Sequence, residues 1–299
     1  MISICIPIYN CDVTKLVTDL HQQASSLDIL FEMLLLDDAS QASFREINSV
    51  LQSLEHVNYA ELTCNVGRSA IRNQFAIKAS YPYLLFIDND AQVCSPTYIS
   101  TYLRQRGVGV ICYGGCSYAL FSGDEFRLRW LFGTQREAIP IDRRSKQPND
   151  YFSTFNFMID KRILLLHPFN EQLTDYGYED VLFKIQALHE GYHITQVDNP
   201  MLHTGLDSND KFLTKTIASI EQLNKLHQQS LDKKSLEDAI QLLGAYRKIE
   251  RLRLTFMVSF SFRILKKMLK KNVLSKKPSL LAFDIYKLGY LCNLKMQNT

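Results

Sequence analysis

Residues 81–93 read YPYLLFIDNDAQV, a hydrophobic run that ends in an aspartate, an asparagine and a second aspartate. The run has the length and the apolar character of a buried strand. Asp and Asn are favoured wherever a strand turns, so a simple turn is one interpretation of this ending. The other interpretation is that Asp88 and Asp90 are functional carboxylates, and the rest of the chain bears on that choice.

Short β-rich runs alternate with helix-like stretches through the first 113 residues. The expected strands lie at 2–8, 31–36, 57–63, 83–88 and 107–113, and the expected helices at about 13–26, 43–54, 68–80 and 95–105. This alternation predicts an α/β fold with a mostly parallel central sheet, flanked by helices and built with right-handed crossovers. The expected strands are apolar almost throughout, which fits burial on both faces of the sheet.

The pattern changes twice beyond the alternating part. Residues 114–150 are polar and irregular and predict loops, and a second ordered block follows with a helix at about 178–190 and a strand at 192–198. From residue 206 onward the pattern is helical. We therefore expect one α/β domain over residues 1–205 and a helical, basic extension over residues 206–299.

The composition is that of an ordinary globular protein, with 46% hydrophobic and 22% charged residues among 299. The seven cysteines are scattered and form no CxxC pair, so neither a disulfide framework nor a zinc site is predicted. No basic region precedes the first expected strand, as a secretory signal would require. The cytoplasm is therefore the expected compartment, and the oligomeric state is not predicted.

Positive charge is concentrated at the end of the chain. Residues 245–299 hold 13 Lys and Arg against 2 Asp and Glu, a net of +11, whereas the other 244 residues hold 21 and 29, a net of −8. Such an asymmetry indicates an anionic partner for the tail. No stretch of the chain reaches the roughly 18–20 apolar residues of a membrane span.

Residues 245–277 mix these cations with aromatic, Leu and Met residues in a helix-compatible stretch. One interpretation is a helix that packs its apolar side on the catalytic domain and leaves its lysines in water. The other is an interfacial helix on an anionic membrane, on the inner face of the cell membrane. Nucleic acid is not expected as the anion, because nothing in the α/β block suits it.

Polar residues follow three further strands of the expected sheet. The first strand ends in Pro7-Ile8-Tyr9-Asn10, the second ends in Asp37-Asp38-Ala39-Ser40, and the third leads into NVGRSAIRN, which contains Arg72. In a parallel sheet, ligands bind outside the carboxyl ends of the strands. Neither the GxGxxG of a dinucleotide fold nor a P-loop follows the first strand.

Each of these residues has a plain structural interpretation beside a functional one. Asp38 or Ser40 could cap the next helix, or Asp38 could accept hydrogen bonds from a base or a ribose. Arg72 could be a surface charge or could face a phosphate. Carboxylates crowded at one sheet edge repel each other, so a hard divalent cation such as Mg²⁺ or Mn²⁺ is expected there, with substrate phosphates as further ligands.

Five motifs, ISICIPIYN, LLLDDAS, NVGRSAIRN, LLFIDNDA and YGYEDVLF, occur in the order and spacing typical of family 2 glycosyltransferases. Roughly residues 1–205 resemble these nucleotide-sugar-dependent enzymes, which have the GT-A fold. The resemblance implies a metal-dependent inverting glycosyltransferase, moving one hexosyl or N-acetylhexosaminyl group from a nucleoside-diphosphate sugar. UDP is favoured over dTDP and GDP, and the acceptor is a hydroxyl of a glycan or lipid-linked molecule in cell-surface polysaccharide synthesis.

The resemblance also assigns the donor-binding residues. Asp38 would contact the nucleobase, with Pro7, Tyr9 and Arg72 nearby. Asp88 and Asp90 match the family's D-x-D element, in which the second aspartate ligates the metal on the diphosphate and the first contributes to ribose or metal. Asn156, in TFNFMI, would line the acceptor side of the donor pocket.

Two further positions follow from the same resemblance. Glu179 and Asp180 match the family's E-D motif, with Asp180 as the catalytic base; acidic residues at a helix start also simply complement the helix dipole. His203, 23 residues after Asp180, matches the histidine that often completes the metal site of Mn²⁺ or Mg²⁺. His167, His189 and His193 lack such support and are interpreted as structural.

Some features depart from well-known relatives. The Q-x-x-R-W signature of processive synthases is absent, since RLRW at 127–130 has Arg127 in place of Gln and precedes the E-D pair. This favours single-sugar addition. The Gly-rich stretch that often precedes the acceptor helix is replaced by STFNF, which leaves the acceptor open.

Two other classes of protein are alternatives. A HAD-type phosphatase would need Thr or Val two residues after the second aspartate, where Gln92 stands. A non-catalytic sugar-nucleotide or glycan-binding protein is the second, and the intact carboxylates argue against it.

Overall fold

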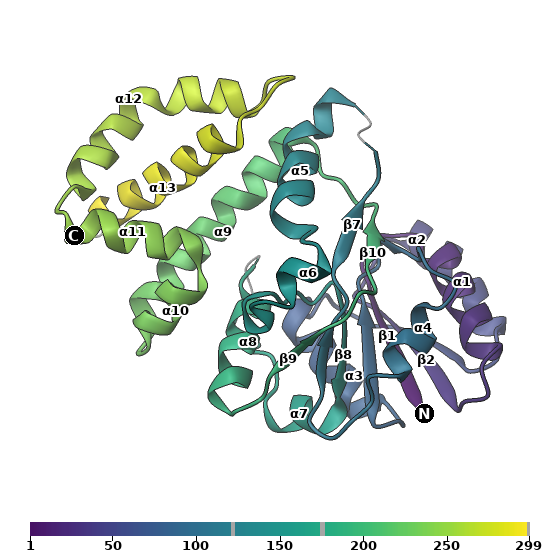
Figure 1. Cartoon of the computed structure of the whole chain (residues 1–299). Helices are drawn as coiled ribbons and strands as arrows, with labels where there is room; N and C mark the ends of the chain where they lie inside the picture. Colours follow the sequence, from purple (N-terminus) through teal and green to yellow (C-terminus); the bar gives the residue numbers. More distant parts are fainter. Residues whose placement is uncertain (121–122, 174–176, 298–299) are drawn as a thin grey trace. The chain divides into compact units, whose positions relative to one another are not determined.

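The computed structural model describes residues 1–120, 123–173 and 177–297 (Figure 1). The chain forms two compact units, the first comprising residues 1–119, 137–174 and 182–205, and the second residues 120–136, 175–181 and 206–299. After residue 205 the chain belongs wholly to the second unit. The second unit also includes two earlier segments that the sequence did not assign to it.

A seven-stranded sheet with the order β3-β2-β1-β4-β8-β6-β9 forms the centre of the first unit. Its strands are β1 (Ile2–Ile8), β2 (Phe31–Asp37), β3 (Val57–Glu61), β4 (Tyr83–Ile87), β6 (Ile111–Tyr113), β8 (Asn156–Asp160) and β9 (Ile194–Gln196). Neighbouring strands run parallel except β8, which is antiparallel to both β4 and β6. The predicted mostly parallel α/β sheet is therefore confirmed.

Helices cover both faces of this sheet (Figure 1). Side chains on one face of β1, such as Ile4 and Ile6, pack with α1 (Thr14–Ser25) and α4 (Tyr98–Leu103). The opposite face, which includes Cys5, packs with α3 (Gly67–Lys78), α7 (Lys161–Leu166) and the later part of α8 (Glu179–His189). Because successive strand residues point to opposite faces, strands between two helical layers are apolar throughout.

A second, three-stranded sheet adjoins the carboxyl end of β4. It has the order β5-β10-β7 and consists of β5 (Ala91–Gln92), β10 (Met201–His203) and β7 (Cys116–Tyr118). β10 runs antiparallel to β5 and parallel to β7. Since β5 directly follows Asp88-Asn89-Asp90, this small sheet brings residues near position 203 beside the end of β4.

The loops predicted for residues 114–150 are a partial error. The segment contains β7, α5 (Arg127–Phe132), a π-helical turn (Gly133–Glu137) and α6 (Ile141–Arg144). The helices α5 and α6 have 6 and 4 residues, too few to show a helical period in the sequence. Arg144 is buried and donates hydrogen bonds to the carbonyl oxygens of Gly114 and Val197, so its side chain replaces missing backbone partners.

The second unit is helical, as predicted. It contains α5 and, near the end of the chain, α9 (Asn209–Gln229), α10 (Lys233–Ala239), α11 (Gln241–Arg251), α12 (Thr255–Val273) and α13 (Leu280–Gln297). Its apolar core joins Leu128 of α5, Leu213 of α9, Phe262 of α12 and Phe283 of α13. Among the described helices, none is both long enough and apolar enough to cross a membrane.

Candidate active site at the strand ends

The strand order places a switch point between β1 and β4. From β1 the chain moves outward to β2 and β3, and then returns to β4 on the other side of β1. Open α/β sheets bind ligands outside the carboxyl ends of the strands at such a point. The register of β1 with β4 ends at Cys5 and Phe86, just before Pro7, whose nitrogen has no hydrogen to donate.

The loops after β1 and β2 are tied to each other. The backbone N–H of Asn10 donates to Oγ of Ser40 (2.8 Å), and the N–H of Gln41 donates to Oδ1 of Asn10 (2.8 Å). Tyr9 lies in the chain between the end of β1 and Asn10. It is 52% exposed, so its ring is available to a ligand. The helix after β2, α2 (Ala42–Ser49), has Gln41 as its N-cap and no side-chain cap, so neither Asp38 nor Ser40 caps it.

Asp38 links the end of β2 to the beginning of α3. Its two carboxylate oxygens accept hydrogen bonds from the backbone N–H groups of Val66 (2.7 Å) and Gly67 (3.1 Å). Burial raises the pKa of Asp38 above its usual value, although these two hydrogen bonds oppose that effect. A carboxylate has about four acceptor positions, so two remain beyond those that hold α3.

Asp88 is paired with Arg72. Oδ1 of Asp88 lies 2.6 Å from Nη2 of Arg72, whose side chain is buried within α3. Burial raises the pKa of Asp88, and the Arg72 guanidinium and the charge of Asp90 act on it in opposite directions. The sequence could not distinguish a surface charge from a site residue at position 72, and the structure shows a buried arginine at the D-x-D element.

Asp90 lies beside His203. Oδ2 of Asp90 is 3.6 Å from Nε2 of His203. The contact depends on the pairing of β5 with β10, in which His203 stands opposite Ala91. It is reinforced by Thr204, whose N–H and hydroxyl both donate to the carbonyl oxygen of Asp90 (2.9 and 2.7 Å).

Two aromatic rings hold the imidazole of His203 between them. The ring of Tyr118 on β7 stacks on it at 5.4 Å between centroids, and the ring of Phe155 stacks on it at 5.1 Å. Rings on both sides restrict rotation of the imidazole and so fix the direction of its nitrogen atoms. Tyr118 and Phe155 are site residues that sequence reasoning missed, because no local motif connects them with position 203.

Gly205 is a second residue that the sequence did not identify. A Cβ atom at this position would overlap Oδ2 of Asp90 and would lie 2.8 Å from its Cβ. Any larger residue would push Asp90 away. Glycine is therefore required here by the close approach of Asp90, not by its backbone angles.

The described residues include no group of three or more His, Cys, Asp or Glu side chains able to enclose a metal ion by themselves. They do include the Asp90–His203 pair, with Asp88 two residues away. Mg²⁺ and related ions in nucleotide-dependent enzymes take one or two protein ligands and complete their shell with substrate phosphates and water. One carboxylate and one imidazole therefore fit a site of this shared kind.

Glu179 and Asp180 are the first two residues of α8, as predicted. Glu179 is buried, whereas Asp180 is partly exposed and its Oδ1 accepts a hydrogen bond from the N–H of Val181 (2.8 Å). Gly177 and Tyr178 before them both have positive φ angles (102° and 72°). Tyr176, the first residue of the YGYEDVLF motif, lies outside the described residues.

Asn156 has no hydrogen-bonding capacity left for a ligand. Its Oδ1 accepts from the hydroxyls of Tyr98 (2.6 Å) and Tyr102 (2.8 Å), and its Nδ2 donates to the carbonyls of Gly115 and Asn199 (both 2.8 Å). The side chain is fully buried. Its role here is to join β8 to α4 and to the segments after β6 and β9, and we do not carry it into the proposed site.

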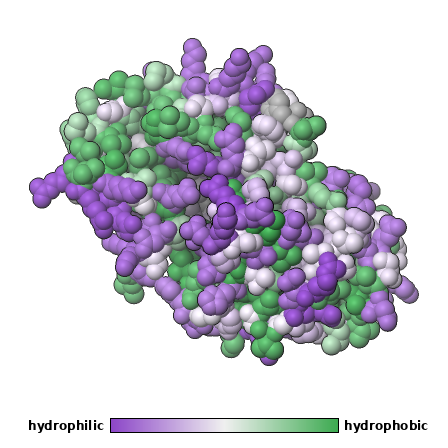
Figure 2. All heavy atoms as spheres, in the orientation of Figure 1, coloured by the Kyte–Doolittle hydropathy of each residue, from purple (hydrophilic) through white to green (hydrophobic). Residues whose placement is uncertain are grey.

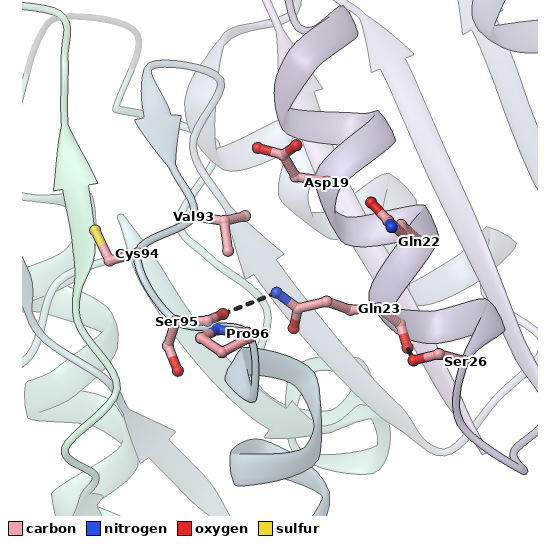
Figure 3. Close-up of a pocket in the computed structure, with 8 residues that line it drawn as sticks. All are labelled: Asp19, Gln22, Gln23, Ser26, Val93, Cys94, Ser95 and Pro96. Carbon is pink, nitrogen blue, oxygen red and sulfur yellow. Dashed lines mark hydrogen bonds between the residues drawn. The ribbon is translucent and has the colours of Figure 1, made fainter.

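A cavity of about 430 Å³ lies between α1 and the segment that follows β5. Figure 3 shows the amide of Gln23 reaching across it to the carbonyl oxygen of Ser95 (2.8 Å), and Oε1 of Gln23 also accepts from the N–H of Ile99 (3.3 Å). Asp19 at its rim is paired with Lys15. None of the predicted site residues lines this cavity.

Comparison with known proteins identifies the family. The sequence profile of Glycosyl transferase family 2 matches residues 3–164, more than half of the chain. Among curated proteins none matches the sequence.

Among solved structures, the mannosyltransferase PcManGT from Pyrobaculum calidifontis, in complex with GDP-Man and Mn²⁺, has a TM-score of 0.57. The two are 13% identical, over 99% of this chain and 86% of that one, so the likeness concerns the fold. TarS 1–349 from S. aureus with UDP-GlcNAc is 15% identical over 99% of this chain and 91% of that one. Its TM-score of 0.49 is too low to support an argument. With a GT-A-type α/β fold, acidic strand ends and a family match from residue 3 to residue 164, the chain belongs to glycosyl transferase family 2.

Proposed function

We propose that this glycosyltransferase is metal-dependent and inverting, and that it moves one sugar from a nucleoside-diphosphate sugar to an acceptor hydroxyl. The observation that supports this most strongly is the pairing of the two D-x-D carboxylates at the switch point. Asp88 is bound by Arg72, and Asp90 lies beside His203. Asp88 therefore has a permanently charged partner. Asp90 instead lies beside an imidazole, which binds metal ions in its neutral form.

The nucleotide would be bound at the ends of β1 and β2. Tyr9 offers an exposed ring for the base, and Asp38 retains acceptor positions for base N–H groups. Pro7 shapes the end of β1 beside them. Arg72 would hold Asp88, with which it is paired, in position next to the diphosphate.

The divalent ion would be held by Asp90 and His203, with Asp88 next to it. When bound, such an ion neutralises charge on the departing diphosphate. Imidazole favours the later first-row ions, so Mn²⁺ is the expected metal, with Mg²⁺ as the weaker substitute. PcManGT, which shares the fold, was solved with Mn²⁺.

The catalytic base would be Asp180, with Glu179 beside it. An ionised carboxylate at this position is able to accept the acceptor's hydroxyl proton. Asp180 is partly exposed at the start of α8, where a substrate has access to it. Inversion follows from direct attack of that hydroxyl on the sugar carbon, because a single displacement reverses its configuration.

The finer assignments rest on the motif resemblance. The donor is proposed to be UDP-linked, carrying a hexose or an N-acetylhexosamine. A GDP-linked sugar is the alternative donor, because PcManGT, which shares the fold, was solved with GDP-Man. The acceptor is proposed to be a glycan or a lipid-linked molecule in cell-surface polysaccharide synthesis, with the enzyme on the cytoplasmic side.

A donor screen tests this proposal. Purified full-length chain is incubated with Mn²⁺ and a panel of UDP-, GDP- and dTDP-sugars, and release of nucleoside diphosphate and thermal shift are both measured. The expected result is metal-dependent stabilisation and slow hydrolysis with one nucleotide class, abolished by a chelator. Stabilisation without any turnover would instead support a non-catalytic sugar-nucleotide-binding protein. Turnover that is unaffected by excess chelator would remove the metal from the mechanism.

A further inference from the structure

We infer that α12 is an interfacial helix by which the second unit lies on an anionic lipid membrane. The inference goes beyond the sugar-transfer reaction and does not depend on it, because it concerns a separate surface of the molecule. Under the proposed function, this surface is where a lipid-linked acceptor would be met. Three features of α12 carry the inference: its exposed apolar row, its separate buried face and its cations.

The exposed row consists of Phe256, Phe260, Ile264 and Met268, spaced four residues apart and therefore on one side of the helix. Each of these side chains is between 56% and 66% exposed. Figure 2 shows apolar residues gathered over α12, at the upper left of the view. Contiguous exposed apolar surface of this kind marks an interaction site.

The buried face of α12 is made by other residues. Phe262, Leu269 and Val273 belong to the core of the second unit, together with Tyr286 of α13. Gly289 of α13 allows this close approach, since a Cβ atom there would lie 2.6 Å from the ring of Phe262. The interpretation in which the tail hides its apolar side within the protein therefore accounts for one face of α12 and leaves the exposed row unexplained.

All five charged residues of α12 are cations, and the helix contains no Asp or Glu. Arg263 is hydrogen-bonded to Asn293, and Lys266 lies over aromatic rings. Lys267, Lys270 and Lys271 are exposed, and among the described residues no carboxylate pairs with them. A helix with exposed aromatic and aliphatic side chains next to unpaired lysines matches the surface of an anionic bilayer, where the apolar side chains enter the acyl boundary and the lysines meet the headgroups.

The combination of these features decides the partner. Nucleic acid would use the lysines but would leave an aliphatic row such as Ile264 and Met268 in water. A second copy of the chain would bring the same cations face to face across the contact, which is unfavourable. Only an anionic apolar surface satisfies both sets of side chains.

Flotation of the full-length chain with phosphatidylcholine vesicles, with or without phosphatidylglycerol, tests the inference. Binding is expected to require phosphatidylglycerol and to weaken as salt is raised. No sugar transfer is measured, so failure of the transferase proposal would leave this result unaffected. Absence from the floated fraction under all conditions, or equal binding to neutral vesicles, would overturn the inference.

Matched variants separate the apolar row from the charges. Changing Phe256, Phe260 and Ile264 together to Ser should weaken binding at least tenfold, which is roughly the loss expected when even one fully buried apolar side chain is removed. The control changes Ile77, Val108 and Leu166 to Ser; these apolar residues of the first unit are more exposed than the row itself, and binding should be unchanged. Equal binding by both triple variants would contradict the inference.

The charge variant changes Lys267, Lys270 and Lys271 to Gln. Each lysine near an anionic surface contributes about a fivefold gain in affinity (about 1 kcal/mol), so the loss should be about 10²-fold. The control changes Lys146, Lys233 and Lys234 to Gln, which removes the same net charge from other exposed positions. Parallel losses in both variants would show a non-specific response to net charge and would overturn the assignment to α12.

A fluorescence measurement reports insertion directly. Phe260→Trp places a probe in the exposed row, and the wild-type chain, with Trp130 alone, supplies the background. The added emission should shift to the blue with anionic vesicles and should be quenched by brominated lipid. Analytical ultracentrifugation without lipid completes the test: a dimer that dissociates in the Phe256, Phe260 and Ile264 triple variant would assign the row to a second copy instead.

Discussion

Nε2 of His203 lies 3.6 Å from Oδ2 of Asp90. His203 is on β10, and Asp90 directly precedes β5, the strand with which β10 pairs at the end of β4. The contact joins the D-x-D element to a residue far away in the sequence, and two stacked rings hold the imidazole in place. If this pair binds the metal, its loss should be visible in metal binding as well as in turnover.

We expect His203→Ala and Asp90→Asn each to weaken Mn²⁺ binding, measured by calorimetry in the presence of nucleoside diphosphate. Loss of a metal ligand should cost at least the 10–100-fold typical of removing a supporting partner. His193→Ala, at an exposed histidine outside the site, is the control and should bind Mn²⁺ normally. Unchanged affinity in both site variants would exclude the pair as metal ligands.

Gly205→Ala tests the position of Asp90 without removing it. The added methyl group would overlap Asp90, so the carboxylate must leave the position that it holds beside His203. We expect Mn²⁺ affinity to fall about tenfold or more. Gly107→Ala is the matched control, because a Cβ atom at Gly107 meets no atom within 4 Å. A variant at position 205 with wild-type affinity would show that the pair tolerates displacement.

Asp180→Asn should lower kcat by about 10²–10⁴, the usual contribution of a general base, and should leave donor binding intact. Steady-state turnover and nucleotide affinity are measured on the same preparation. Glu190→Gln, just beyond the last residue of α8, serves as the comparison. Near-normal turnover by the Asn variant would remove Asp180 from the chemistry.

Asn156→Ala should destabilise the fold strongly. It would leave the Tyr98 hydroxyl and the Asn199 carbonyl in the core without their partner. The Tyr102 hydroxyl would keep the backbone carbonyl of residue 156 (3.1 Å), and the Gly115 carbonyl would keep the N–H of Met201 (3.5 Å). Unsatisfied buried groups cost about 1–3 kcal/mol each, and with partial relaxation a loss of about 3–5 kcal/mol in the free energy of unfolding is expected. Urea denaturation measures this. If Asn156→Ala is as stable as wild type but binds the donor more weakly, Asn156 contributes to donor binding after all.

The raised pKa of Asp38 makes a prediction about stability and pH. Because burial raises this pKa in the folded state, the folded chain binds more protons than the unfolded chain between the usual and the raised pKa. Asp38 therefore stabilises the fold at low pH, and this contribution is lost as pH rises through the raised pKa. The amide of Asp38→Asn does not titrate in this range. The free energy of unfolding of this variant, relative to wild type, should therefore increase as pH rises from about 4.

Urea denaturation of the ligand-free chain at a series of pH values measures this difference. Asp142→Asn, at an exposed aspartate of α6, is the control. If the difference in free energy of unfolding between Asp38→Asn and wild type does not change with pH, the pKa of Asp38 is the same in the folded and unfolded states.

The sequence by itself determined six strands of the large sheet and the acidic strand ends, but not β8 or the three short strands of the small sheet. Apolar runs that end in DDAS and DND stand out because a strand covered on both faces must be apolar and a site at its end must be polar. The five motifs indicated the family, and the profile match over residues 3–164 confirmed it. The helical character of the chain after residue 206 was equally clear, because long amphipathic helices repeat over several turns.

The tertiary structure decided how those residues are paired and which ones are unavailable. Arg72 of α3 is paired with Asp88, which directly follows β4, and His203 is placed beside Asp90 by β10. The side chain of Asn156 uses all of its hydrogen bonds inside the core. It also decided which apolar face of α12 is buried and which is exposed. These are contacts between residues distant in the chain, and spacing within a sequence specifies only the periodicity of one element, not the side chains that another element brings against it.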